Sequence, residues 1–180
     1  MRNFVRRIAF AAVTAVALAA CSPTYNWRTL NLDSVGAQAL VPCKPDYSTR
    51  EVPLLEGQAT ITLHMQACDV GDVTYALSWL NIPPGQDANA AMKRWLSASM
   101  AGAQAHEQQA NTEQEQPPTW SVKGAAFTKR YRFQGKRHDG QTIAVDMGMA
   151  QRGPSVVQLA IYGGSFAQAQ RAEFWQGLAW

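Results

Sequence analysis

Alternation of apolar and polar residues along several short segments is the feature that most limits what this chain can fold into. The segment "ATITLHMQA" (59–67) is apolar at every second residue, and "VTYALSWL" (73–80) repeats the pattern. "TIAVDMGMA" (142–150) and "SVVQLAIYGG" (155–164) continue it later in the chain. A period of two places alternate side chains on opposite faces of a strand, so these segments predict half-buried antiparallel strands.

Two helices are expected between and after these strands. The first begins near Asp87, a good N-cap residue, and runs to about Ala105. Its buried stripe has helical spacing and comprises Met92, Trp95, Leu96, Ser99 and Met100. The second helix begins near Ser165 and buries Phe174, Trp175 and Leu178. The order of strands, helix, strands and helix predicts an α+β fold: an antiparallel β-sheet flanked by two main helices.

Strand ends and turns carry further signals. "STREVPLL" (48–55) reads as a weaker strand at a sheet edge, because Pro53 has no N–H to give to a neighbour. "FTKRYRFQG" (127–135) reads as another strand, and the Asp139-Gly140 pair after it is a strong hairpin signal.

The first 21 residues have the layout of an export signal. Arg2, Arg6 and Arg7 precede an apolar run over 8–20, which is shorter than the roughly 20 residues that span a bilayer. The residues just before Cys21, Leu18-Ala19-Ala20, resemble the lipobox of bacterial lipoproteins. The alternative is an ordinary signal peptide that happens to have Cys21 near its cut.

The lipobox resemblance implies a domain plan and a location. The chain would be cut before Cys21, which would carry lipid on its thiol and its new amino group. Ser22 at the next position implies the outer membrane, with the protein on the periplasmic side. The expected organisation is then a signal-peptide helix over 1–20, a lipidated tether over 21–36 and a single α+β domain over 37–180.

The charge balance argues against nucleic acid as a partner, and the cysteine content predicts a disulfide. Three of the 16 Lys and Arg residues lie in the expected signal, which leaves 13 bases and 13 acids, so there is no electrostatic case for nucleic acid. In the oxidising environment outside the cytoplasm, Cys43 and Cys68 are expected to form a disulfide. A two-thiol metal site is the alternative, but the chain has no Cys-x-x-Cys spacing and no His pair to complete it.

A basic run along the strand at 127–135 is the candidate contact surface. Its bases are interleaved with three aromatic residues, Phe127, Tyr131 and Phe133, which are expected to point inward. The bases would then form one solvated positive patch. This patch is either a plain solvated face, as charge runs usually are, or a contact for an acidic envelope protein or anionic lipid headgroups. The bases are Lys129, Arg130, Arg132, Lys136 and Arg137.

No catalytic or metal-binding set is apparent. His64, His106 and His138 fall on a polar strand face, a polar loop and a turn, so each is expected at the surface. Ser165 follows two glycines but lacks the Gly-x-Ser-x-Gly pattern of a nucleophile elbow, and helix capping explains it. We therefore expect no enzyme, no metal and no cofactor.

The closing strand, turn and helix, "VVQLAIYGGSFAQAQRAEFWQGL" (156–178), resemble the PsbP/Mog1-type α/β sandwich of small exported proteins. "TYNWR", "PCKPD" and "MQACD" are similar to pieces of Gram-negative lipoproteins of similar length. The fold resemblance implies an accessory or assembly role without catalytic residues. The expected function is a lipid-anchored interaction module of the cell envelope. The alternative is a small-ligand binder with a cleft between sheet and helix, lined by residues such as Trp79 and Trp95.

Overall fold

The computed structural model describes residues 24–103, 119–137, 139–166 and 172–180. Its main element is a six-stranded antiparallel sheet with the strand order β3-β4-β5-β8-β7-β6. The strands are β3 (Asp46–Val52), β4 (Ile61–Val70), β5 (Val73–Asn81), β6 (Phe127–Lys136), β7 (Thr142–Arg152) and β8 (Ser155–Gly163). The alternating segments of the sequence thus form β4, β5, β7 and β8, as predicted.

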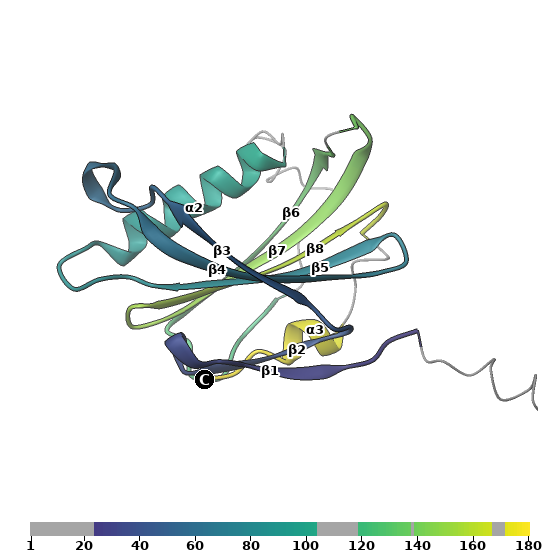
Figure 1. Cartoon of the computed structure of the whole chain (residues 1–180), viewed down its shortest axis with the longest axis horizontal. Helices are drawn as coiled ribbons and strands as arrows, with labels where there is room; N and C mark the ends of the chain where they lie inside the picture. The colour runs from purple at the N-terminus through teal and green to yellow at the C-terminus, as the bar shows by residue number, and fades with distance from the viewer. Residues whose placement is uncertain (1–23, 104–118, 138, 167–171) are drawn as a thin grey trace, which may run out of the picture.

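A second, two-stranded sheet pairs β1 (Arg28–Leu32) with β2 (Ala37–Val41), joined by the short 3-10 helix η1 (Asp33–Val35). The other helical elements are η2 (Glu56–Gln58), α2 (Ala88–Gly102) and α3 (Ala172–Gln176). Figure 1 shows α2 on one side of the large sheet, and β1, β2 and α3 on the other. No helix among the described residues is long and apolar enough to cross a membrane.

The α+β expectation is confirmed in its coarse form, with a larger share of sheet than predicted. The antiparallel sheet is present and α2 covers one face, but the described part of the second helix, α3, has only five residues. The two-stranded sheet covers the rest of that face. Ser165, where this helix was expected to begin, lies in a bend, and the described part of the helix starts at Ala172. Residues 167–171, the expected signal peptide and Cys21 fall outside the described residues.

The segment expected to be a tether contributes to the core. β1 lies within it, and Leu32 and Val35 are buried against the large sheet. The backbone N–H of Asn26 already donates to the carbonyl of Pro42. The ordered structure therefore begins well before residue 37, because the apolar side chains at the end of this segment fill a face that α3 leaves uncovered.

Two local signals in the sequence behave as predicted, one at the start of α2 and one in the turn between β6 and β7. The carboxylate of Asp87 accepts hydrogen bonds from the backbone N–H groups of Asn89 and Ala90, which caps α2. Gly140 has a φ of 81° in the β6–β7 turn, a conformation that glycine adopts without strain. The helix cap and the turn each depend on residues that are close together in the sequence, so the sequence alone predicts them.

The neighbouring strands β7 and β8 are buried on both faces, although their sequences predict burial of one face. The reason is that α2 packs on one side of the sheet while Trp120, Trp175 and the small sheet pack on the other. Gly148 of β7 makes this close approach possible. A side chain there would meet Trp120 at 2.6 Å and Trp175 at 2.7 Å.

Candidate functional site: a groove between α2 and the sheet

A groove of about 880 Å³ runs between helix α2 and the face of the large sheet. The sheet side is made by β3, β4, β5 and β8 together with Ile143 of β7, and the helix side by the α2 residues from Trp95 to Gly102. One end opens near the Cys43–Cys68 disulfide, and Lys136 and Arg137 also lie on its wall. Arg50, Val52 and Ala98 also line a second hollow of about 640 Å³ next to this groove.

The groove exists because side chains beneath this edge of α2 are small. Trp95, which is buried with Ile61 and Leu63, holds the helix away from the sheet. The positions beside this contact have too little volume to fill the space that remains, and interiors are otherwise close-packed. The small groove residues are Ser48, Ala67, Thr74, Ala76, Ser78, Ala98, Ser99 and Gly102.

The groove has an apolar strip and a charged rim with more bases than acids. Leu63, Met65, Trp95 and Ile143 contribute the larger apolar surfaces. The rim carries four bases and two acids: Lys44, Arg50, Lys136 and Arg137, and Asp46 and Asp69. The arrangement therefore favours a molecule with an apolar body and a negative group.

Polar groups on the groove floor are oriented by neighbouring side chains. The side-chain amide of Gln158 donates to Ser99 Oγ at 3.1 Å and to Met147 Sδ at 3.3 Å, which ties β8 to α2. Burial raises the pKa of Tyr162 above its usual range, so this phenol stays protonated at neutral pH and can donate a hydrogen bond.

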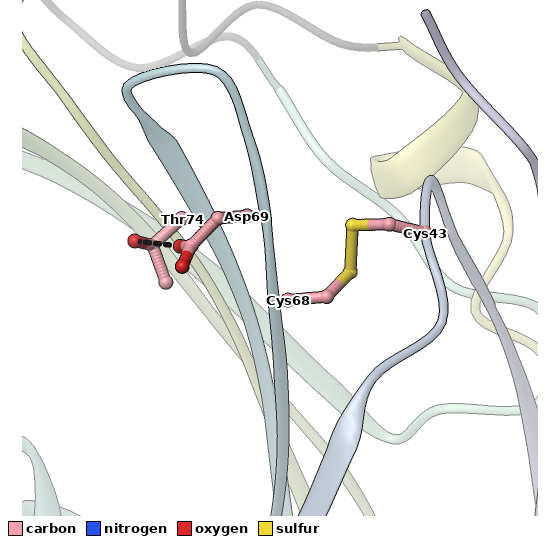
Figure 2. The surroundings of a disulfide bond; sticks show 4 residues. All are labelled: Cys43, Cys68, Asp69 and Thr74. Carbon is pink, nitrogen blue, oxygen red and sulfur yellow. Dashed lines mark hydrogen bonds between the residues drawn. A yellow bond between two sulfur atoms is a disulfide. The ribbon is translucent and has the colours of Figure 1, made fainter. Parts of the chain in front are cut away.

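The predicted disulfide is confirmed and lies at one end of the groove. Cys43 precedes β3, Cys68 lies in β4, and their Cα atoms are 5.9 Å apart (Figure 2). Beside it, the Thr74 hydroxyl donates to the Asp69 carboxylate at 2.5 Å. A cross-link over this 25-residue separation stabilises the fold by about 3 kcal/mol on the loop-entropy model, and it ties the segment before β3 to β4 at the groove's end.

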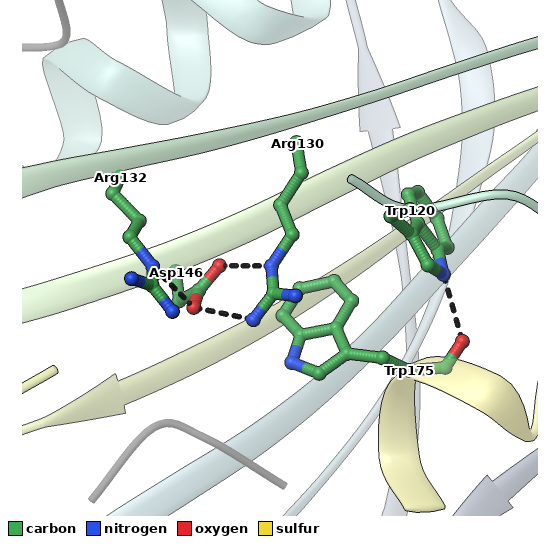
Figure 3. A network of polar contacts seen from close by, with 5 residues as sticks. All are labelled: Trp120, Arg130, Arg132, Asp146 and Trp175. Carbon is green, nitrogen blue, oxygen red and sulfur yellow. Dashed lines mark hydrogen bonds and ion pairs between the residues drawn. The ribbon is translucent and has the colours of Figure 1, made fainter. Parts of the chain in front are cut away.

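The prediction that the five basic residues form a single solvated patch is wrong. Lys129, Lys136 and Arg137 are exposed, but the side chains of Arg130 and Arg132 are each only 6% exposed. Both guanidinium groups bind Asp146, which is fully buried (Figure 3). The physical reason is that Trp175 of α3 and Trp120 cover the face of the sheet that carries these arginines. The sequence analysis did not predict that either tryptophan packs on this face.

The arginine–aspartate cluster holds β6, β7 and α3 together. Arg130 makes two hydrogen bonds of 2.6 Å to the carboxylate of Asp146, and its guanidinium lies 3.8 Å from the centre of the Trp175 ring. Arg132 Nε donates to the same carboxylate at 2.9 Å. The indole N–H of Trp120 donates to the Trp175 carbonyl at 2.7 Å, which anchors α3 (Figure 3). These arginines are structural and are not available to an outside partner.

A sequence signal for this cluster existed in the hairpin. The Asp139-Gly140 turn sets the register of β6 and β7, and a symmetric hairpin around it places Arg132 opposite Asp146. Asp146 is also the only charged residue in the otherwise apolar "TIAVDMGMA". A lone acid inside an apolar strand indicates a buried ion pair when the partner strand supplies bases.

Other predicted residues are distributed differently from the expectation. Trp95 lines the groove, but Trp79 lies on the opposite face, where its indole N–H donates to Ser34 Oγ at 2.9 Å. His64 is only partly exposed, since it bonds to the Tyr47 hydroxyl and stacks on Trp79. His106 and His138 fall outside the described residues. Within the described ranges, no group of three His, Cys, Asp or Glu side chains could hold a metal ion.

Comparison with known proteins adds no relative: no family model, no curated protein and no solved structure matches this chain.

Proposed function

We propose that this chain is a lipid-anchored cell-envelope protein that binds an elongated amphiphile with a negatively charged end in the groove between α2 and the sheet. The observation that carries the proposal is the groove itself. Its volume of about 880 Å³ falls within the 300–1,000 Å³ (roughly) that is usual for small-ligand sites. A fully closed core would instead have favoured an interaction surface alone.

The lining accounts for both parts of such a ligand. Apolar contacts with Met65 and Trp95 bury a hydrocarbon or aromatic portion. Lys136 and Arg137 are exposed on the groove wall and offer charge-assisted hydrogen bonds to a carboxylate, phosphate or sulfonate. Lys136 and Arg137 belong to the exposed part of the predicted basic run, and binding the negative group of the ligand is the role proposed for them.

Filling the groove tests the proposal. Ala98 is exposed on α2 and lines the groove, so Ala98→Trp places a large ring in the opening without entering the core. We expect this variant to bind the fluorescent anionic amphiphile cis-parinaric acid at least tenfold more weakly than the parent protein. The measurement is a fluorescence titration of the full chain at fixed ionic strength.

Ala101→Trp is the matched control, because Ala101 is exposed on the same helix and does not line the described grooves. It should bind cis-parinaric acid like the parent. Equal affinities in the parent and both tryptophan variants would contradict the groove as the binding site, as would a parent that binds no cis-parinaric acid.

A second candidate is the interaction module predicted from the sequence, with the groove receiving a segment of an envelope protein. The observation that favours it is the number of hydroxyl groups on the floor, from Ser48, Thr74, Ser78 and Ser99, which suit a peptide backbone. A photo-crosslinking amino acid at position 98 separates the two candidates in cells. A heavier protein adduct supports the module, whereas labelling confined to small molecules supports the ligand binder.

The membrane anchor is proposed from the lipobox resemblance and is tested separately. Replacement of Cys21 by serine should abolish incorporation of radiolabelled palmitate in cells, since the thiol and the new N-terminus would be lost as acceptors. Because the backbone of Asn26 is already hydrogen-bonded to Pro42, the five residue steps from Cys21 to Asn26 would hold the folded part within about 18 Å of the lipidated Cys21. Equal labelling of parent and variant would rule out this anchor.

A further inference from the structure

Strand β3 forms one edge of the large sheet and pairs with β4 on one side only. Six of its seven residues are exposed, and Val52 is the exception. Among the described residues, Tyr47 is one of two large hydrophobic residues that are exposed, at 56%. An unprotected edge strand presents unpaired backbone donors and acceptors to another strand.

Two of the three charges on β3, Asp46 and Arg50, have no partners within their own sheet, whereas the carboxylate of Glu51 accepts a hydrogen bond from the Thr62 hydroxyl. Asp46 lies opposite Ala67 of β4, and Arg50 lies opposite Leu63. Within the described part of the chain, neither charge makes a hydrogen bond or a salt bridge. Both side chains line the same side of the strand, toward the groove, because their positions differ by an even number.

We propose that β3 pairs antiparallel with β3 of a second copy of this chain, with Ser48 on the twofold axis. In this register Asp46 lies opposite Arg50 of the second copy, and Arg50 lies opposite its Asp46. The dimer therefore contains two symmetric ion pairs. On the other face, Tyr47 lies opposite Thr49 of the second copy, an aromatic and β-branched pair that stabilises sheets. The proposal does not depend on which ligand the groove binds.

Neighbouring registers are less favourable on charge. With Arg50 on the axis, the two arginines would face each other. With Tyr47 on the axis, Arg50 would face Lys44 of the second copy, and with Thr49 on the axis no opposite charges would be paired. Like charges directly opposite each other destabilise a strand pair, so the β3 sequence selects the register with Ser48 on the axis.

The other edge strand, β6, is unsuited to pairing with its own copy. It carries Lys129, Arg130, Arg132 and Lys136 and no acidic residue, so two copies would bring only positive charges together. Its two arginines already bind Asp146. The self-complementary edge is therefore β3, and isologous pairing through it closes as a dimer rather than continuing as a filament.

The predicted contact is short, and so the dimer is weak in dilute solution. Only Asp46 to Arg50 of each copy are paired throughout, which is less than the roughly 1,200–2,000 Å² buried by stable complexes. Confinement of both copies to one membrane surface would raise their effective concentration and favour the pair. A covalent trap is the appropriate measurement.

Oxidative cross-linking of the full chain tests the register. Opposed residues in an antiparallel pair have Cβ atoms about 4.5–5.5 Å apart, which a disulfide can bridge after small adjustments. Ser48→Cys should give covalent dimer at least fivefold above the parent chain, which sets the background because Cys43 and Cys68 are bonded to each other. Thr49→Cys, displaced by one residue, should cross-link at least fivefold less than Ser48→Cys.

Charge exchange tests the ion pairs in the Ser48→Cys background. Either Asp46→Arg or Arg50→Asp alone should reduce the cross-linked fraction at least fivefold, because like charges then face each other. The two changes together should restore it to within twofold. Efficient cross-linking through Thr49→Cys, insensitivity to a single charge reversal, or failure of the double exchange to restore the dimer would each overturn the proposal. Unchanged melting temperatures would show that these exposed positions leave the fold intact.

Discussion

Replacing Asp146 with alanine is expected to lower the free energy of unfolding by about 3–5 kcal/mol. Asp146 is fully buried and is the shared partner of Arg130 and Arg132, whose side chains are 6% exposed. Its removal leaves two guanidinium groups without their counter-ion in a site that water does not reach. Urea unfolding of the parent and variant, followed by tryptophan fluorescence, measures the loss.

Asp72→Ala provides the matched control, because Asp72 is an exposed acid in the β4–β5 turn. It should change the free energy of unfolding by about half a kcal/mol or less. If Asp146→Ala fails to fold, Asp146→Asn keeps the shape and some hydrogen bonds, and should still be clearly less stable than the parent. Losses for both Asp146 variants that match Asp72→Ala would show that the cluster is solvated.

A triple replacement shows how much of the lost unfolding free energy comes from leaving the arginines unpaired and how much comes from losing the ion pairs themselves. Apolar residues of similar volume in place of a buried ion cluster often leave stability unchanged or raise it. Combining Asp146→Leu with Arg130→Met and Arg132→Met should therefore recover at least half of the stability lost in Asp146→Ala. No recovery would indicate that the specific hydrogen bonds, rather than the unpaired charges, determine the loss.

Replacing Phe133 with alanine is expected to cost about 3–5 kcal/mol, which is large for a domain stable by about 5–15 kcal/mol. Phe133 is 1% exposed and packs with Met100 and Ala103 beneath the end of α2. Truncation leaves a cavity that these neighbours fill only in part. Loss of the phenyl ring should also loosen the end of α2, since the backbone N–H of Lys136 donates to the Ala103 carbonyl beside it.

Phe127→Ala is the control within the same strand. Phe127 has the same side chain on the same face of β6, but it is 37% exposed. Phe127→Ala should lower the free energy of unfolding by well under about 1.5 kcal/mol, which is less than the loss expected at the buried Phe133. Equal losses of unfolding free energy at the two positions, measured by urea unfolding, would contradict the burial of Phe133 against the end of α2.

The sequence predicted those features that depend on neighbouring residues along the chain. Period-two alternation gives β4, β5, β7 and β8, the Asp87 side chain caps α2, and Asp139-Gly140 forms the turn of the β6–β7 hairpin. The Cys43–Cys68 disulfide followed from the expectation that the chain is exported, which left one available pair of cysteines. Phe133 was correctly placed in the core because it shares a strand face with other aromatic residues.

Only the tertiary structure decided which surfaces are covered, and this is where the predictions for the site were incomplete. Alternation shows that a strand has two faces, but the element that packs on each face comes from distant parts of the chain. Arg130 and Arg132 were therefore expected in solvent, although the Trp175 ring lies over Arg130 and Asp146 balances part of the charge of both. Leu32 brings the expected tether into the core for the same reason.

The groove could not be read from the sequence either, because it is a space that side chains leave empty. Its volume depends on where α2 crosses the sheet, and this is set by the contacts of Trp95 at one point and Met100 further along the helix. Residues such as Ala76 and Ser78 appear in the sequence only as small members of a strand. Their role as a groove floor arises from the distance at which larger neighbours hold the helix.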